Sequence, residues 1–345
     1  MSTCAVEDAG YSVEDGDLAR DGDAAVAVWR ASLGNVDGRA AKFEWFYRAA
    51  PDGAQLQVLR AGPGRDIVGT AGVGWRRMRA DGRNLRGGLL ADMAVLAGHR
   101  MLGPALQLQR AACERALSGG DFVYGFPNAN AVPVVKRLGY AHVGDMVLYV
   151  RALRHAPYLE RMLPRPVARL LGRGLDGATR LRDALRNLHR GRLQASWSDT
   201  PWDGPHPRLS AHPGLLEGVR DRAMLEWRFA HSPLAAFRFL YLRRGDDAPP
   251  SAWFVCHRDG DVLRIADFGF HPDAAASHCI ARLAEAAIAE DCRSLAVECC
   301  LPEEERSALC GSGFRERQRR PIYARWKDTA QPAPAIRFTA FDEDE

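Results

Sequence analysis

The sequence predicts an α/β protein built from two similar mixed-sheet units with flanking helices, joined by a basic helical linker. Three observations lead to this fold class. The length of 345 residues is roughly that of two ordinary domains. Segments with helical apolar spacing alternate along the chain with strand-like segments. Short stretches of the first half also recur in the second half in the same order, which indicates a duplicated unit.

The first unit is expected to begin with two helices, over 24–33 and 38–50, because apolar residues recur there at helical spacing. Asp81-Gly82 predicts a tight hairpin turn, since glycine accepts a positive φ without steric cost. The remaining expected elements are strands over 55–61, 66–78 and 84–96, a helix from Gly103 to about 118, a strand over 121–126, a helix over 129–138 and a strand over 141–153.

Three pairs of similar segments support the duplication. FEWFYRAAP (43–51) is echoed by LEWRFAHSP (225–233), LLADMAV (89–95) by RIADFGF (264–270), and LGY (138–140) by SGF (312–314). We therefore expect one domain over 11–153, a linker over 154–210, a second domain over 211–328 and a flexible acidic tail over 329–345 that ends in FDEDE.

The linker is strongly basic, with eleven arginines and three acidic residues between Arg151 and Arg192. Its leucines recur at three- and four-residue spacings, as in an amphipathic helix. Two interpretations follow: peripheral contact of residues 154–192 with an anionic membrane surface, or a helix packed on its own domain with its arginines in water. We favour the second.

Composition narrows the possible classes of protein. The hydrophobic fraction of 47% and the charged fraction of 26% are those of a globular protein in water, and the net charge of +4 predicts no specific nucleic-acid partner. The first thirty residues lack the features of a signal peptide, which predicts a cytoplasmic protein. The eight cysteines include no C-x-x-C pair, so we expect no metal site.

The segment HRMLGPALQL (99–108) connects a predicted strand to a predicted helix. Gly103 would let the backbone approach a ligand closely, and Pro104 suits the first helical turn because no amide hydrogen is needed there. Free amides and the helix dipole attract phosphate oxygens, and Arg100 adds positive charge. These features predict a pyrophosphate site, although purely structural strand–turn–helix units share them.

The longer segment LADMAVLAGHRMLGPALQLQRAA resembles the acyl-CoA-binding segment of the GNAT superfamily of N-acyltransferases, with its V-x-P-x-x-[QR]-x-x-G-x-[GA] loop. Val95, Arg100, Gly103 and Ala105 match this pattern, and Ala97 replaces the usual proline. The resemblance implies two GNAT-like domains. It also implies cofactor contacts from Ala94, Val95, Leu96, Arg100, Met101, Leu102, Gly103 and Ala105.

The segment NANAVPVVKRLGY (128–140) is similar to the family's N-x-x-A-x-x-x-Y-x-x-x-G-[FY] element, which adds Asn128 to the implied cofactor contacts. It departs from the family at Val135, where many relatives have a tyrosine that protonates the leaving thiolate. Tyr124 and Tyr140 are the candidates to replace that tyrosine, and both are also candidate core residues.

The resemblance implies transfer of an acyl group from acetyl-CoA or another acyl-CoA to a small-molecule amine. A strand amide, that of Ala94 or Val95, would polarise the thioester carbonyl. Asp92 lies two residues before this amide on the same strand and is the candidate general base, while a purely structural carboxylate is an equally weighted alternative.

The second copy keeps the layout but not this chemistry. HPDAAASHCIARL has neither the arginine nor the glycine of the first copy, and Asp273 near the helix start would repel a pyrophosphate. We therefore expect one cofactor site and an amine acceptor such as an amino sugar or a surface-polysaccharide precursor. The alternatives are FemAB-like aminoacyl transfer, to which tandem halves are also similar, and a non-catalytic acyl-CoA sensor or scaffold. The oligomeric state is not predicted.

Overall fold

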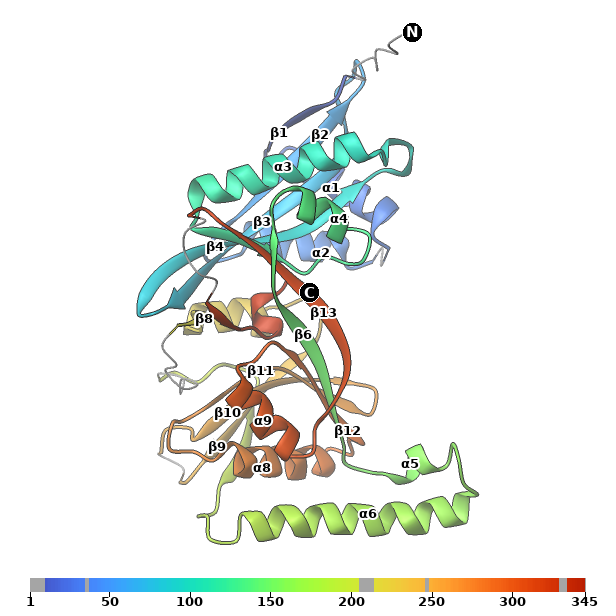
Figure 1. Ribbon diagram of the computed structural model, residues 1–345, viewed down its shortest axis with the longest axis vertical. Helices are drawn as coiled ribbons and strands as arrows, with labels where there is room; N and C mark the ends of the chain where they lie inside the picture. The colour runs from blue at the N-terminus through green and yellow to red at the C-terminus, as the bar shows by residue number, and fades with distance from the viewer. Residues whose placement is uncertain (1–9, 35–36, 205–213, 246–247, 329–333, 345) are drawn as a thin grey trace. The chain divides into compact units, whose positions relative to one another are not determined.

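The computed structural model describes residues 10–34, 37–204, 214–245, 248–328 and 334–344, which form two compact units (Figure 1). The first unit contains Met1–Gly144, Pro321–Ala333 and Glu343–Glu345, and the second contains Asp145–Arg320 and Pro334–Asp342. Parts of the expected linker and second domain (205–213 and 246–247) and of the expected tail (329–333 and 345) lie outside the described residues.

The first unit is a mixed sheet with the strand order β1–β2–β3–β4–β5–β13. Strands β1 to β4 are antiparallel neighbours, and β5 runs parallel to β4. Its strands are β1 (Ser12–Gly16), β2 (Ala54–Ala61), β3 (Asp66–Ala80), β4 (Arg83–Val95), β5 (Phe122–Gly125) and the end of β13 (Arg315–Trp326). Its helices are α1 (Gly22–Ser32), α2 (Arg39–Phe43), a π-helix η1 (Glu44–Arg48), a 3₁₀ turn η2 (Ala97–His99), α3 (Leu102–Gly119) and α4 (Val132–Arg137).

The alternation of side chains along β3 explains the two layers of helices. Val73 and Trp75 pack in one buried cluster with α3 residues such as Leu108. The intervening residues are glycines, and a Cβ at Gly72 or Gly74 would collide with the ring of Tyr47 or Phe46 on η1. Successive strand residues point to opposite faces, so large side chains support α3 while glycines admit the aromatic side chains of η1.

The second unit has the strand order β6–β12–β11–β10–β9–β7, and it also contains β8 and β14, which pair with each other in parallel. Its strands are β6 (Ala141–Ala152), β7 (Gln194–Ser198), β8 (Leu215–Gly218), β9 (Phe237–Arg243), β10 (Ala252–Asp259), β11 (Val262–Phe270), β12 (Ser294–Cys299) and β14 (Ala335–Arg337). Its helices are α5 (Ala156–Leu159), α6 (Arg165–Arg186), α7 (Arg222–Leu225), a π-helix η3 (Glu226–Ala230), α8 (Ala276–Ala289), α9 (Glu303–Gly311) and a 3₁₀ turn η4 (Ala340–Asp342).

One long strand from each half of the sequence, β6 and β13, contributes to the sheet of the other unit. Most of β6 belongs to the second unit, where it pairs antiparallel with β12. The end of β13 belongs to the first unit, where Tyr323–Trp326 pair with β5. Each unit is therefore assembled from segments far apart in the sequence.

The segments that echo each other in sequence have the same local structure. In both copies a short α-helix continues into a π-helix that begins at the glutamate of the shared Glu-Trp pair, at Glu44 and at Glu226. Both LLADMAV and RIADFGF lie on strands with a β-bulge, and each is followed by a loop and a long helix. The predicted repeat is thus a structural repeat.

The structure agrees with some of the other sequence-based expectations and differs from others. Asp81 and Gly82 both have positive φ and form the predicted turn between β3 and β4. Strands β1, β7, β8 and β14 were not expected from the sequence. The expectation of a loose acidic tail is wrong for residues 334–344, because β14 pairs with β8 and Phe341 and Asp342 are buried. Among the described helices, none is both long and apolar enough to span a membrane.

Candidate active site

The candidate site lies where β4 separates from β5. The two strands pair over Gly87–Leu89 and Phe122–Tyr124, after which β5 ends at Gly125 while β4 continues to Val95. Ala94 and Val95 remain paired with β3 on the other side, opposite Thr70 and Gly69. The outer backbone edge of the last residues of β4 is therefore open to an extended ligand, in the described part of the sheet.

The first turn of α3 follows directly. Its N-cap residue Met101 forms no side-chain cap, and the first amides of an α-helix have no acceptor within the helix. The amide of Met101 donates to the carbonyl of His99 at 2.8 Å, so it is already used. A Cβ on Gly103 would meet no atom within 4 Å. No acceptor is recorded among the described residues for the main-chain N–H groups of Leu102 and Gly103, which are the candidate donors of this turn.

Arg100 is exposed and tied back to the preceding strand. Its Nε donates to the carbonyl oxygen of Val95 at 2.8 Å, and the Ser32 hydroxyl donates to the same oxygen at 3.2 Å. His99 is half-buried, and its Nδ1 lies 2.8 Å from the hydroxyl of Tyr11. These contacts fix the loop between β4 and α3 from both sides.

Asp92 lies at the β-bulge of β4 with a φ of 49°, in the left-handed region that aspartate tolerates better than most residues. The Trp29 indole donates to the Thr70 hydroxyl at 2.8 Å, and this hydroxyl donates to the Asp92 carbonyl at 3.2 Å. The bulge is therefore supported by buried hydrogen bonds, and it turns the Asp92 side chain toward α2 and η1.

The carboxylate of Asp92 is enclosed. Lys42 Nζ lies 2.8 Å from its Oδ1, and the Tyr47 hydroxyl donates to its Oδ2 at 3.0 Å. Both side chains of the ion pair are 2% exposed. Burial raises the pKa of Asp92, while the positive charge of Lys42 opposes that rise. This geometry favours the structural alternative for Asp92 over a role as an open general base.

The candidate acids are also in the core. Tyr124 is fully buried and stacks on Phe122 with a centroid distance of 5.6 Å. Tyr140 packs in the same buried cluster as Val135, and burial raises its pKa well above 10.0, as does the nearby Cys113 thiol.

Asn128 serves as a turn cap. Its Oδ1 accepts hydrogen bonds from the amides of Asn130 at 3.1 Å and Ala131 at 3.0 Å, just before α4 begins. This is the turn that an asparagine side chain commonly forms with the backbone two residues on.

The other residues implied as cofactor contacts differ in exposure. Arg100, Met101 and Gly103 are exposed, Ala94 and Val95 are buried, and Leu96 and Ala105 are half-buried. For Leu102 only the backbone is described.

Sequence reasoning missed the residues that neutralise Asp92. Lys42 also bonds Asp344 at 2.9 Å, and this contact joins residues 302 positions apart. No local pattern in the sequence indicates it. Lys42 precedes the shared Glu-Trp pair by two residues in a predicted helix, which gave no reason to expect a buried charge.

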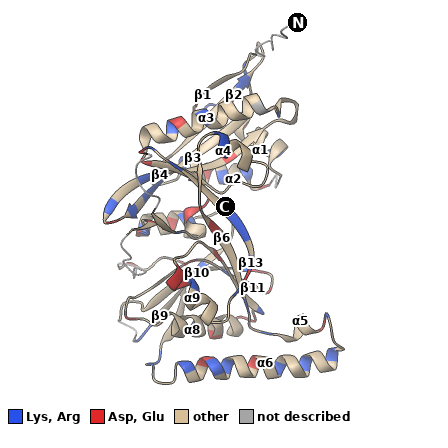
Figure 2. Ribbon diagram, viewed as in Figure 1, with Lys and Arg blue, Asp and Glu red and all other residues tan. Residues whose placement is uncertain are grey.

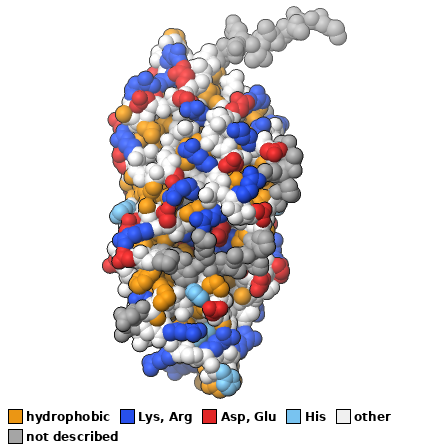
Figure 3. Space-filling view, turned by 90° about the vertical axis from the view of Figure 1, so that its left-hand side faces the viewer, with side chains coloured by type: hydrophobic (Ala, Val, Ile, Leu, Met, Phe, Trp, Pro, Cys, Tyr) orange, Lys and Arg blue, Asp and Glu red, His pale blue; other side chains and the backbone are white. Residues whose placement is uncertain are grey.

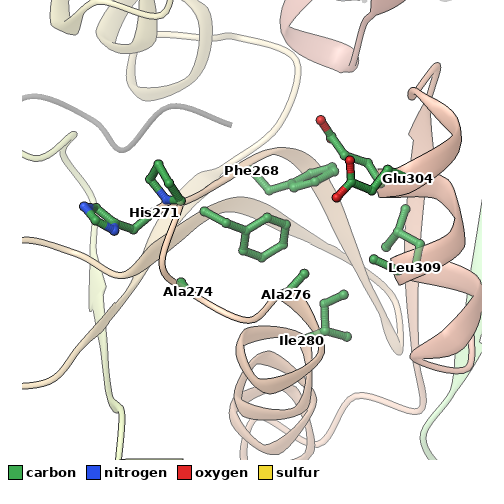
Figure 4. A pocket seen from close by; sticks show the side chains of 11 residues that line it. Phe268, His271, Ala274, Ala276, Ile280, Glu304 and Leu309 are labelled. Atoms are coloured by element: carbon green, nitrogen blue, oxygen red, sulfur yellow. The ribbon is translucent and has the colours of Figure 1, made fainter. Parts of the chain in front are cut away.

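The second unit has a pocket at the corresponding position, between the end of β11, the start of α8 and α9 (Figure 4). Its volume is about 160 Å³, and its walls include Phe268, Phe270 and Ile280. Glu304 and Glu305 contribute carboxylates, and Glu305 Oε2 accepts from Arg337 Nε at 3.1 Å. Carboxylates at this position would repel a pyrophosphate. The described residues include no His, Cys, Asp and Glu cluster that could hold a metal ion.

No known family model matches the sequence, and no curated protein matches it. Solved structures do match. A GCN5-related N-acetyltransferase from Anabaena variabilis ATCC 29413 is 10% identical in sequence, with a TM-score of 0.62. The match covers 92% of this chain and 73% of that protein. A tandem GNAT protein from the clavulanic acid biosynthesis pathway, solved without AcCoA, is 11% identical in sequence, with a TM-score of 0.56. The match covers 93% of this chain and 100% of that protein.

A third match is the GCN5-related glucosamine N-acetyltransferase region of a fungal multi-domain β-N-acetylglucosaminidase. It is 11% identical with a TM-score of 0.54, and the match covers 93% of this chain and 38% of that one. The chain therefore has the fold of the GCN5-related N-acetyltransferases.

Proposed function

We propose that the chain is an acyl-CoA-dependent N-acyltransferase that acts with acetyl-CoA or another acyl-CoA on an amine. The observation that carries this proposal is the open first turn of α3 at Gly103, placed where β4 leaves β5. The fold shared with N-acetyltransferases supports it.

The residues of this loop fit a diphosphate. The N–H groups of Leu102 and Gly103 would donate to its oxygens, with the positive end of the α3 dipole behind them. Pro104 has no N–H, and the Met101 amide is occupied, so fewer backbone donors are available than in a typical helix start. Arg100 would supply charge from its exposed guanidinium.

Acyl-CoA would supply a thioester, which an amine attacks with formation of a C–N bond and loss of the thiolate. In this proposal the strand amide of Ala94 or Val95 polarises the carbonyl. The amine loses one proton and the thiolate gains one. Asp92, Tyr124 and Tyr140 are the proposed groups for these transfers, and the burial of all three predicts that they contribute less than exposed groups would.

Calorimetric titration with acetyl-CoA tests the cofactor site. We expect micromolar affinity, about −8 kcal/mol, with one site per chain. Gly103→Glu should abolish binding, because it places a negative carboxylate at the diphosphate position without a steric clash in the free protein. Gly103→Gln is the matched control for side-chain volume, because it adds a side chain of nearly the same size without the negative charge. Gly177→Glu, at another open glycine on α6, controls for the added charge. Unchanged binding by Gly103→Glu would place the cofactor elsewhere.

The acceptor is proposed to be an amino sugar or a related precursor of a surface polysaccharide. The glucosamine N-acetyltransferase region among the structural matches supports this class of acceptor. Release of free thiol from acetyl-CoA in the presence of glucosamine and its phosphate esters would measure the activity. Aminoacyl transfer of the FemAB type predicts instead a salt-sensitive affinity for tRNA.

A second candidate function is a non-catalytic acyl-CoA sensor. The burial of Asp92, Tyr124 and Tyr140, and the core position of Val135, favour it. Tight acetyl-CoA binding that Gly103→Glu abolishes, without turnover of any amine in a broad panel, would support the sensor over the transferase.

A further inference from the structure

The strongest unexplained feature of the second unit is one side of helix α6. This 22-residue helix contacts its own unit through the side that carries Ala168 and Gly172, both of which are buried. A Cβ on Gly172 would lie 2.6 Å from the backbone of Ala156, so α5 and α6 are in close contact there. The opposite side of α6 has no such packing among the described residues.

The two acidic residues of α6 point toward the unit. Asp176 accepts from the amide of His155 at 2.9 Å and lies 2.7 Å from the Nδ1 of its ring. Asp183 forms an ion pair with the buried Arg151. Both negative charges of the helix are therefore used in fixing it to its own unit.

The side opposite Ala168 and Gly172 is apolar and exposed. At 3.6 residues per turn its large apolar residues fall along one stripe, in one group near each end of the helix with Gly174 and Ala178 between them. The stripe and its fractional exposures are Val167 (45%), Leu170 (74%), Leu171 (49%), Leu181 (60%), Leu185 (62%) and, just past the helix, Leu188 (69%). We call these six residues the apolar stripe. An exposed apolar surface of this extent marks an interaction site.

Arginines border the apolar stripe. Arg173 and Arg180 lie along one edge and Arg182 along the other, by the same helical geometry. Arg173 and Arg180 are exposed. Arginine is the commonest charged residue of α6, as the blue segments of its ribbon show (Figure 2). Blue Lys and Arg side chains are also exposed at the lower end of the space-filling view (Figure 3). The exposed side thus combines an apolar centre with positive edges.

We propose that α6 binds the surface of an anionic lipid bilayer, with the apolar stripe inserted among the acyl chains and the arginines on lipid phosphates. An amphipathic helix with an apolar centre and basic edges lies in the plane of the interface between the lipid bilayer and water. Its 22 residues span about 33 Å, so the whole stripe reaches the bilayer at once. This reverses the sequence-based preference for a helix whose apolar side packs on its own domain.

A second copy of the chain is a less suitable occupant. Two apolar stripes packed against each other would bring their bordering arginines together, and the acidic residues that could compensate are engaged on the other side of the helix. A lipid phosphate layer complements the arginines instead. The proposal is independent of acyl transfer and concerns a different unit from the candidate active site.

Flotation of the full-length protein with vesicles tests the proposal. We expect binding to vesicles of phosphatidylcholine with 30% phosphatidylglycerol, weaker binding in high salt, and at least about tenfold weaker binding to pure phosphatidylcholine. Leu181→Ser with Leu185→Ser, and separately Arg173→Gln with Arg180→Gln, should each lower the affinity for anionic vesicles by about tenfold or more. Leu234→Ser, at an exposed leucine outside α6, is the control and should bind as the parent does.

These side chains are exposed, so the variants should keep the parent's circular dichroism and thermal midpoint. Equal binding to neutral and anionic vesicles, or no binding to either, would overturn the proposal. So would a dimer in light scattering that the leucine double variant converts to a monomer, because the apolar stripe would then be an interface between copies. Acetyl-CoA binding serves as a separate readout and should be the same in all these variants.

Discussion

Lys42 and Asp92 form an ion pair of 2.8 Å in the core of the first unit, and Arg220 and Asp267 form one of the same length in the second. Asp92 and Asp267 occupy the same position in the two repeated segments. Each cation also binds a carboxylate from the end of the chain: Lys42 binds Asp344 and Arg220 binds Asp342. The repeat therefore includes a buried charge cluster as well as the bulged strand.

The first prediction separates structure from catalysis at Asp92. Asp92→Asn keeps a side chain that tolerates the positive φ but removes the charge that faces Lys42. Removing one partner of a buried pair costs about 3–5 kcal/mol, and the remaining bond from Lys42 to Asp344 should keep the loss near the lower value. Urea unfolding measures it.

Two controls accompany this variant. Asp267→Asn should destabilise the protein comparably, because the second unit has the matching pair. Adding Lys42→Met and Asp344→Asn to Asp92→Asn should recover part of the loss, since no unpaired charge then remains beside the asparagine. If Asp92→Asn kept the parent's stability and its affinity for acetyl-CoA but lost turnover, Asp92 would be the general base rather than a structural residue.

The second prediction concerns the contact of β3 with η1. A Cβ on Gly72 would lie 1.8 Å from the Tyr47 hydroxyl oxygen, so Gly72→Ala must displace a buried side chain that also bonds Asp92. We expect a loss of about 3 kcal/mol in the free energy of unfolding. Gly103→Ala, which meets no atom within 4 Å, should change stability little.

A double-mutant cycle identifies the cause of this loss. Tyr47→Ala leaves room for the new methyl group, so Gly72→Ala should cost much less in that background than in the parent. If the two losses were simply additive, the steric explanation would be wrong.

Sequence patterns predicted the features that depend on neighbouring residues. The Asp81-Gly82 turn needs only two residues that accept positive φ, so a local pattern was enough to predict it. The repeated Glu-Trp segments also identified equivalent structures, although helical spacing could not distinguish the π-helix from a continuing α-helix. The strand–loop–helix arrangement around Gly103 follows from equally local signals.

The features that sequence reasoning missed depend on distant residues. FDEDE was interpreted as a solvated tail because nothing near it in sequence binds its charges, yet Asp342 pairs with Arg220, 122 positions away. The burial of Asp92 likewise depends on Lys42, which is 50 positions away on another element. The exchange of β6 and β13 between the two units has no local signature, since either strand alone suits either sheet.

The third prediction follows from the packing of the chain end. Phe341 is 1% exposed, and the guanidinium of Arg220 lies 4.5 Å from the centre of its ring. Phe341→Ala should therefore lower the free energy of unfolding by about 3–5 kcal/mol, the usual cost of such a cavity. If urea unfolding gave Phe341→Ala the same free energy of unfolding as the parent, the chain end would be a loose tail after all.

The fourth prediction concerns acid stability. Asp21 is buried at the start of α1, where its carboxylate accepts from Arg20 at 2.9 Å and from Arg60 at 3.0 Å. The hydrogen bond from Arg20, with those from the Asp17 amide and Arg60, lowers its pKa below the usual 3.8 despite desolvation. A carboxylate whose pKa is lowered by folding stabilises the protein above its unfolded pKa, and that contribution is lost as the pH falls toward the folded value.

Asp21→Asn should thus lower the free energy of unfolding by about 2 kcal/mol at pH 7, the scale of a hydrogen bond to a charged group. The difference from the parent should stay constant from pH 7 to about 5 and shrink below pH 3.8, where the unfolded parent takes up a proton at Asp21. Asp23→Asn, at an exposed position in the same turn, should change stability by less than about 0.5 kcal/mol. A difference between Asp21→Asn and the parent that is independent of pH down to 3 would show that the charge of Asp21 contributes nothing, and that only its shape matters for the start of α1.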